Sequence, residues 1–135
     1  MDENAPIKVY MTKKLIGVKP DDTIQEACRD MVEFDIGSLV VVDNGNVVGF
    51  FTKSDIIRRV IVPGLAYNTP VAEIMSKELI TVNVNTPLKK VLEIMAAKRI
   101  KHMLIEEEGK VVGIFTLSDL LEASRRKLET AISVE

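Results

Sequence analysis

The sequence predicts an α/β (α+β) protein built from two β-α-β-β-α repeats that pack sheet to sheet about a pseudo-twofold axis. Sliding the 135-residue chain by 64 positions aligns its two halves without a gap, and both halves show the same succession of strand and helix patterns. A unit of about 60 residues buries too small a fraction of its surface to be stable alone. We therefore expect the two repeats to pack together.

The repeat is clearest in two matching stretches. Gly45–Asp55 reads GNVVGFFTKSD and Gly109–Asp119 reads GKVVGIFTLSD, while Met11-Thr12-Lys13 aligns with Met75-Ser76-Lys77. A constant offset with identities at glycine, threonine and aspartate indicates a duplication. The expected domain boundaries are 6–62 for the first repeat, 63–70 for a linker and 71–126 for the second repeat.

Each repeat opens with a short apolar strand, expected at 15–18 and 79–84, and continues with an amphipathic helix. Asp21-Asp22-Thr23 and Asn85-Thr86-Pro87 are helix-start signals. Apolar residues then recur at i, i+3, i+4 and i+7, which predicts one buried stripe on each helix. The stripes are Ile24, Ala27, Cys28 and Met31, and Leu88, Val91, Leu92 and Met95.

A hairpin and a final helix complete each repeat. The strands 38–42 and 47–51 flank an Asn44-Gly45 turn, and 106–109 forms the second turn. The apolar runs at 38–42 and 47–48 predict strands that are buried on both faces. Final helices are expected to begin near Ser54 and Ser118, with apolar stripes at Ile56, Ile57, Val60 and Ile61, and at Leu117, Leu120, Leu121, Ser124 and Leu128.

Composition excludes several classes of function. There are 18 basic and 20 acidic residues, 4% aromatic residues and no Trp, which argues against nucleic-acid binding. Arg58-Arg59 and the run 125–127 are the basic clusters that this alternative would use, although basic residues near the end of a helix also complement its dipole. Cys28 is the single cysteine, so a disulfide within the chain and a thiolate zinc cage are excluded. We expect Cys28 to be a buried, inert thiol on its helix stripe.

Catalysis and membrane insertion are also not expected. His102 is the single histidine, and no Cys, Asp or Glu stands at metal-ligand spacing from it, so we expect no metal site, no catalytic residues and no enzyme activity. The chain opens Met-Asp-Glu-Asn and has no long apolar run, so we expect no signal peptide and no membrane span. These features predict a cytoplasmic protein.

The motifs together resemble a known family. Met-Thr/Ser-Lys at the start of each repeat, 36–43, and Gly-x-x-Thr-x-Ser-Asp before each final helix are similar to the tandem CBS (cystathionine-β-synthase-type) domain pair, or Bateman module, over roughly residues 6–124. The resemblance implies a stand-alone regulatory module that binds an adenosyl compound in clefts between the repeats. AMP, ADP, ATP and S-adenosylmethionine are the candidate ligands, and no catalytic cofactor is implied.

The repeated Thr-x-Ser-Asp motif has two compatible interpretations. Thr followed three residues later by Asp is a helix capping box, which needs no ligand. The resemblance implies instead that the Asp accepts hydrogen bonds from ribose hydroxyls, with Thr and Ser hydroxyls near the phosphates. The candidate ribose and phosphate residues are Thr52, Ser54, Asp55, Thr116, Ser118 and Asp119.

The two repeats differ where phosphates are expected. Lys101 and His102 enter the second hairpin, whereas Gly37 and Ser38 enter the first, so we expect two unequal sites. The resemblance implies that these four residues lie on the phosphate side of the ligand. It also implies that main-chain groups around Ile16 and Ile80 contact adenine.

The resemblance further implies a homodimer, a flat disc of four repeats, that forms through the apolar faces of the final helices. A regulated protein would then read the ligand-dependent change. The alternative is a structural or interaction module without a ligand.

Overall fold

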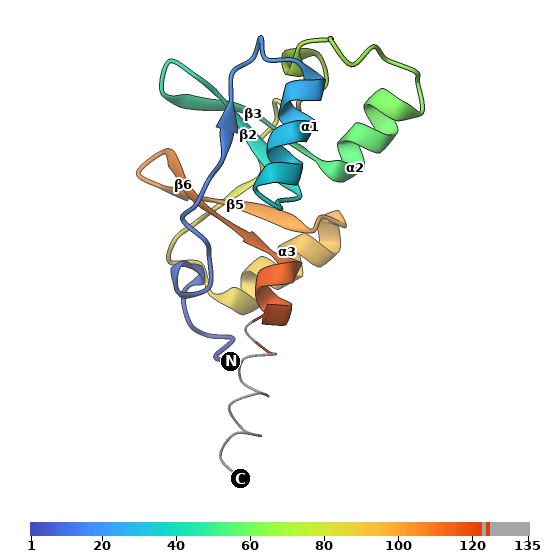
Figure 1. Ribbon diagram of the computed structural model, residues 1–135. Helices are drawn as coiled ribbons and strands as arrows, with labels where there is room; N and C mark the ends of the chain where they lie inside the picture. The colour runs from blue at the N-terminus through green and yellow to red at the C-terminus, as the bar shows by residue number, and fades with distance from the viewer. Residues whose placement is uncertain (123, 125–135) are drawn as a thin grey trace. The chain divides into compact units, whose positions relative to one another are not determined.

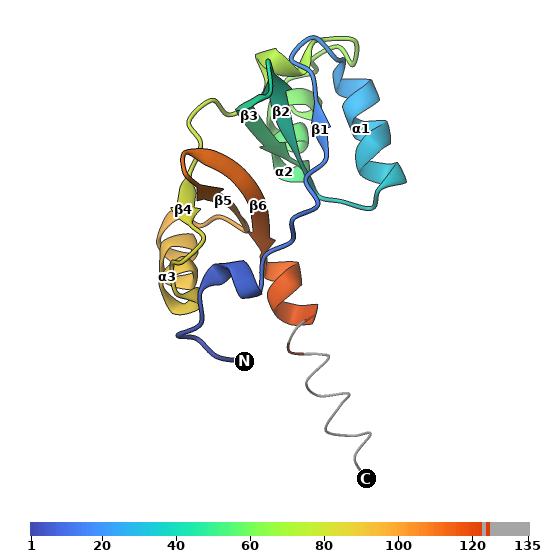
Figure 2. The same ribbon diagram turned by 90° about the vertical axis from the view of Figure 1, so that its left-hand side faces the viewer.

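Two three-stranded sheets carry the two repeats (Figures 1 and 2). The first strand of each sheet runs parallel to the second, which pairs antiparallel with the third. The structure, a computed structural model, describes residues 1–122 and 124. The predicted α/β class and the two repeats are confirmed, with first strands shorter than expected. The strands are β1 (Gly17–Val18), β2 (Ser38–Asp43), β3 (Asn46–Thr52), β4 (Thr81–Asn83), β5 (His102–Glu107) and β6 (Lys110–Thr116).

Helices flank each sheet (Figures 1 and 2). The second helix of the first repeat, α2, continues directly into a π-helical turn, η2, and residues 117–122 are helical after β6. Short 3-10 turns, η1 and η3, open the two repeats. The helical elements are η1 (Ile7–Val9), α1 (Ile24–Glu33), α2 (Lys53–Ile56), η2 (Ile57–Ile61), η3 (Val71–Glu73) and α3 (Leu88–Lys98).

Local sequence explains where α1 and α3 begin. Thr23 caps α1, because its hydroxyl accepts a hydrogen bond from the amide of Glu26 and the Glu26 carboxylate accepts one from the Thr23 amide. Pro87 precedes α3 with φ −62°, where its missing N–H leaves no helical bond unmade. Arg99 ends α3 in the left-handed region, with φ 55°.

The hairpin turns follow the Asn-Gly prediction. Asn44 and Gly45 have φ of 51° and 78°, and Glu108 and Gly109 have φ of 51° and 80°. Two successive positive φ angles define the turn that matches the twist of paired strands, and glycine adopts this conformation without strain. The hairpins predicted around both turns are therefore confirmed.

Each sheet has a core on its helical face. Leu39 and Val41 of β2 pack in one core, and Val40 between them is 3% exposed, so residues on both faces of β2 are buried as predicted. The same prediction is wrong for Val47 and Val48 of β3, which are half-buried. The first core contains Val18, Ile24, Ala27, Met31, Leu39, Val41, Phe51, Val60, Val71 and Ile74. The second contains Ile7, Val82, Val84, Leu88, Val91, Met95, Met103, Ile105 and Phe115.

The chain folds as two compact units that do not follow the repeat boundaries. Leu15–Leu79 forms the first unit, and Met1–Lys14 joins the described residues from Ile80 onward in the second. Ile7 is fully buried in the second core, and the amide of Ile7 donates to the carbonyl of Thr86. Val71, 64 positions later, is fully buried in the first core. The opening segment of each repeat therefore lies in the unit that contains the rest of the other repeat.

The predicted stripes on the final helices are partly wrong. Val60 is fully buried, but Ile57 and Ile61 are 57% and 51% exposed. The amide of Val62 donates to the carbonyl of Ile57, five residues back, so the helix is wider here and its faces are not those of an α-helix. Leu121, equivalent to Ile57, is 70% exposed, Ser124 is exposed, and Leu128 lies outside the described residues.

No helix within the described residues is both long enough and apolar enough to span a membrane.

Candidate functional site

The Thr52–Asp55 motif forms a complete capping box at the start of α2. Oδ2 of Asp55 accepts hydrogen bonds from the amide of Thr52 at 2.9 Å and from its hydroxyl at 3.2 Å. The Thr52 hydroxyl oxygen also accepts one from the amide of Asp55 at 3.3 Å. The capping interpretation is therefore confirmed for the first repeat.

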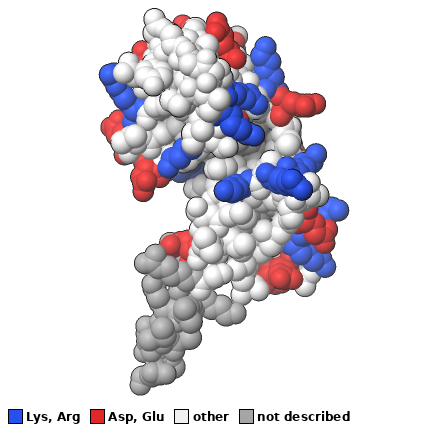
Figure 3. All heavy atoms as spheres, turned by 90° about the vertical axis from the view of Figure 1, so that its right-hand side faces the viewer, with Lys and Arg blue, Asp and Glu red and all other residues white. Residues whose placement is uncertain are grey.

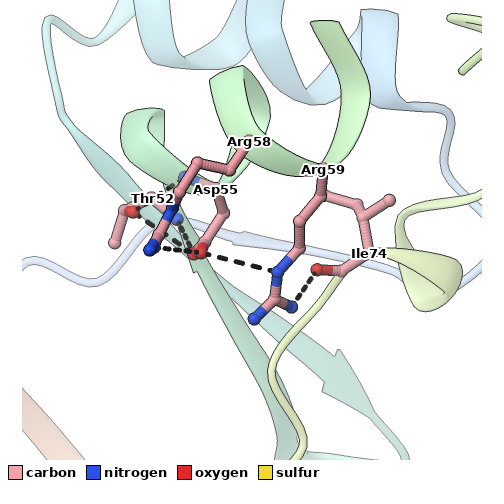
Figure 4. Close-up of polar contacts among 5 residues, drawn as sticks. All are labelled: Thr52, Asp55, Arg58, Arg59 and Ile74. Carbon is pink, nitrogen blue, oxygen red and sulfur yellow. Dashed lines mark hydrogen bonds and ion pairs between the residues drawn. The ribbon is translucent and has the colours of Figure 1, made fainter. Parts of the chain in front are cut away.

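Two arginine side chains contact the other carboxylate oxygen of Asp55 (Figure 4). Nη2 of Arg58 lies 3.3 Å and Nε of Arg59 lies 3.8 Å from Oδ1. Nη1 of Arg59 also donates to the carbonyl of Ile74 at 2.8 Å, which ties the helix to the segment after η3. Among the described residues Asp55 is the one buried charged side chain, and both of its oxygens have partners.

The second repeat has a capping box of the same kind, but it has no arginine at the positions equivalent to Arg58 and Arg59. Oδ2 of Asp119 accepts from the amide of Thr116 at 2.9 Å, and the Thr116 hydroxyl accepts from the amide of Asp119 at 3.1 Å. Asp119 is half-buried, and its Oδ1 forms no hydrogen bond or ion pair with any residue that the structure describes. The residues equivalent to Arg58 and Arg59 are Glu122 and Ala123.

Main-chain bonds bring the predicted phosphate residues to these boxes. Ser38 pairs with Thr52 across β2 and β3, and the carbonyl of Gly37 accepts from the amide of Lys53 at 3.0 Å. Gly37 and Ser38 therefore lie beside Thr52 and Lys53, where α2 begins.

The second unit repeats this arrangement. His102 pairs with Thr116 across β5 and β6, and the carbonyl of Lys101 accepts from the amide of Leu117 at 3.2 Å. Lys101 and Ser118 are exposed, while His102 is half-buried. The sequence left open which carboxylate Lys101 and His102 accompany; within their own unit it is Asp119.

The predicted adenine contacts fall on different units. Ile16 belongs to the first unit, where its carbonyl accepts from the amide of Val40 at 3.2 Å. Ile80 belongs to the second and is 37% exposed.

Two cavities lie away from the predicted site. One of about 510 Å³ is lined by residues at the far ends of β1 and β2, including Asp21, Asp22 and Asn44. One of about 310 Å³ lies between η2 and Tyr67. Neither contains a predicted site residue.

The described residues contain neither a cluster of metal ligands nor an activated thiol. Within the described part of the chain, no three His, Cys, Asp or Glu side chains gather as metal ligands would. Cys28 is half-buried, and desolvation raises the pKa of its thiol, which keeps the thiolate scarce at neutral pH.

The arginine contacts were missed from the sequence. Arg58 and Arg59 were interpreted as complements of a helix dipole, or as a basic cluster, whereas their guanidinium groups face Asp55. The signal was available, because basic residues three and four positions after an acid share its helix face. The basic run 125–127 lies outside the described residues.

Comparison with known proteins identifies the family. The CBS domain family model matches residues 7–62 and 71–126. The chain belongs to the CBS domain family and carries two such domains, as the motifs predicted. A CBS pair is a regulatory module, and the comparisons indicate no catalytic domain in the matched residues.

Relatives and solved structures agree with this assignment. CBS domain-containing protein YhcV of Bacillus subtilis is 37% identical over 114 residues, which cover 84% of this chain and 81% of YhcV. The crystal structure of an uncharacterized conserved protein from Pyrococcus horikoshii is 75% identical with a TM-score of 0.91, covering 93% of this chain and 96% of that one. The CBS domain pair of protein MJ0100, in complex with 5′-methylthioadenosine and S-adenosyl-L-methionine, is 26% identical with a TM-score of 0.77, covering 87% and 98%.

Proposed function

We propose that this CBS pair is a regulatory module that binds an adenosyl compound, of the adenine nucleotide or S-adenosylmethionine type, without catalysing a reaction. Support comes from membership in the CBS family and from the structurally similar MJ0100 pair, whose structure contains methylthioadenosine and S-adenosylmethionine. The ligand would stabilise one arrangement of the chain, and a partner protein would read the change.

The observation that carries the proposal is Oδ1 of Asp119, which has no hydrogen-bond or ion-pair partner among the residues that the structure describes. A carboxylate with a free oxygen accepts hydrogen bonds from the two vicinal hydroxyls of a ribose, as acidic residues do in dinucleotide sites. The Thr116 amide holds the other oxygen at 2.9 Å, so the carboxylate is oriented before a ligand arrives. An oriented acceptor loses less conformational entropy on binding.

The neighbours of Asp119 suit a phosphate or another polar group at the ligand's 5′ end. Lys101 supplies a positive charge and His102 a ring that can donate a hydrogen bond, and both lie beside Thr116 within the second unit. In the first unit, Ser38 and the main chain at Gly37 stand in the equivalent places and bring no charge. Main-chain groups around Ile16 and Ile80 remain the proposed adenine contacts.

Melting temperature tests the proposal. A panel of AMP, ADP, ATP, S-adenosylmethionine and methylthioadenosine at millimolar concentration should contain at least one ligand that raises the melting temperature, because a ligand that binds only the folded state stabilises it. Guanosine and cytidine monophosphates are the controls, since they share ribose and phosphate but not adenine. No shift with any adenosyl compound would contradict the proposal and favour a structural module.

We also propose a homodimer formed through the final helix of the first repeat. Ile57, Ile61 and Val62 are 57%, 51% and 77% exposed and cluster on η2 and the residue after it. Exposed apolar clusters on a globular protein mark interaction surfaces.

The charge distribution does not favour nucleic acid as the partner. On the face in Figure 3, acidic and basic side chains are interspersed over the described residues rather than gathered into a basic surface. The first unit carries 6 basic and 10 acidic residues. Binding to a phosphate backbone depends on a surplus of positive charge, which that unit lacks.

A further inference from the structure

The two carboxylates that the proposed function relies on are unequal in their own units. Both oxygens of Asp55 are engaged, Oδ2 by Thr52 and Oδ1 by Arg58 and Arg59 (Figure 4). Asp119 repeats only the contact of Oδ2, with Thr116.

The residues that align with Arg58 and Arg59 at the offset of 64 explain this difference. Where the first repeat has Arg58, the second has Glu122, which reverses the charge three residues after the aspartate. Where the first has Arg59, the second has Ala123, which has no charge. The two aligned positions of the second repeat therefore carry no residues that could form the same pair of contacts.

These contacts oppose ribose binding at Asp55. A ribose diol donates two hydrogen bonds, so it needs acceptor positions that are free or cheaply vacated. At Asp55 the diol would have to displace the charge-assisted hydrogen bond from Arg58, which is stronger than a bond from a neutral hydroxyl. It would also have to displace the ion pair with Arg59 at 3.8 Å. Arg59 is also tied to the Ile74 carbonyl at 2.8 Å, so displacing it would disturb a second contact.

We propose that Arg58 and Arg59 determine which repeat binds the ligand: they hold Asp55 as a structural carboxylate and leave Asp119 as the ribose acceptor. This inference rests on the proposed adenosyl function. The inference assigns one ligand of this class to each chain. Arg58 and Arg59 of the first repeat then determine that the ligand binds at Asp119 of the second repeat.

Exchanging the residues between repeats tests the inference. The double variant Arg58→Glu/Arg59→Ala gives the first repeat the residues of the second. Calorimetric titration with AMP and with S-adenosylmethionine at millimolar concentration should show one site in the wild type and two in the double variant. Lys53→Leu is the matched control, because it also copies the second repeat and removes a positive charge from α2, but Lys53 makes no contact with Asp55. It should keep one site.

The reciprocal variant, Glu122→Arg, places an arginine three residues after Asp119 and should weaken binding roughly tenfold or more. If circular dichroism shows that the double variant is unfolded, the affinity of Glu122→Arg alone tests the inference. Two sites in the wild type, one site in a folded double variant, or unchanged affinity in Glu122→Arg would each overturn the inference. Absence of binding by the wild type to AMP, ADP, ATP, S-adenosylmethionine and methylthioadenosine alike would instead overturn the proposed function itself.

Discussion

Nη2 of Arg58 lies 3.3 Å from Oδ1 of Asp55, and this contact distinguishes the surroundings of two aspartates that the sequence presents as equivalents. The carboxylate of Asp55 is buried, with a side chain that is 9% exposed, so its partners matter to folding. Asp119 has the same capping bonds, but its second oxygen has no partner within the described residues.

Asp55→Asn should therefore destabilise the protein more than Asp119→Asn. The amide side chain keeps an oxygen for the Thr52 amide but loses the charge that faces two guanidinium groups. We expect a loss of about 1–3 kcal/mol in the free energy of unfolding for Asp55→Asn, and less than about 1 kcal/mol for Asp119→Asn. Urea denaturation measures both, and equal losses would contradict the structural role of Asp55.

The methionine that opens each repeat explains a glycine in the hairpin of the same unit. A Cβ on Gly113 would lie 2.7 Å from Sδ of Met11 and 2.9 Å from the carbonyl oxygen of Thr12. A Cβ on Gly49 would meet the Met75 side chain alone among its three nearest atoms.

Gly113→Ala should cost about 1–3 kcal/mol of stability, because the Thr12 backbone cannot move aside as a side chain can. Gly49→Ala should cost less, and adding Met75→Ala should recover part of that loss by removing the obstacle. Thermal unfolding ranks the variants. A greater loss for Gly49→Ala than for Gly113→Ala would show that the close approach of the backbone is not the determinant.

Cys28 should react slowly and make stability fall at high pH. Burial raises the pKa of its thiol, so as pH rises past the ordinary thiol pKa the unfolded chain releases its proton while the folded chain still holds it. The contribution of Cys28 is fully present below that ordinary pKa and is lost as pH rises through the folded one. Unfolding free energy measured up to alkaline pH should decline more steeply in the wild type than in Cys28→Ala. Identical slopes, or alkylation as fast as in urea, would refute this.

The proposed homodimer predicts a change in sedimentation. The wild type should sediment as a dimer, and Ile57→Glu/Ile61→Glu should sediment as a monomer, because buried carboxylates without partners oppose association. Val9→Glu is the control, since Val9 is 63% exposed and lies outside the proposed interface. A wild-type monomer at all concentrations would rule the interface out, as would a dimer unaffected by the double variant.

Much of the fold could be predicted because its signals are local. The Thr23 cap, the Asn44-Gly45 turn and the stripe of Ile24, Ala27 and Met31 each depend on residues close in sequence, and each is present in the structure. The duplication allowed the elements of the second repeat to be predicted from those of the first.

What could not be predicted depends on chain packing and helix geometry. Periodicity placed Ile57 and Ile61 on the buried stripe, but a turn with a bond spanning five residues leaves them exposed. Ile7 packs in the core of the second repeat. Short-range sequence patterns do not indicate which distant segments pack together, so this contact could not be predicted. The Asp55 contacts were readable from spacing, yet the helix-dipole interpretation of Arg58 and Arg59 obscured them.

Binding of an adenosyl ligand through Asp119 is the central claim, and calorimetric titration of Asp119→Asn beside the wild type and Asp55→Asn tests it most directly. With AMP and S-adenosylmethionine at millimolar concentration, the wild type and Asp55→Asn should each bind one molecule of at least one of the two ligands per chain. Asp119→Asn should bind neither while remaining folded by circular dichroism. Binding by Asp119→Asn with the affinity of the wild type would contradict the account.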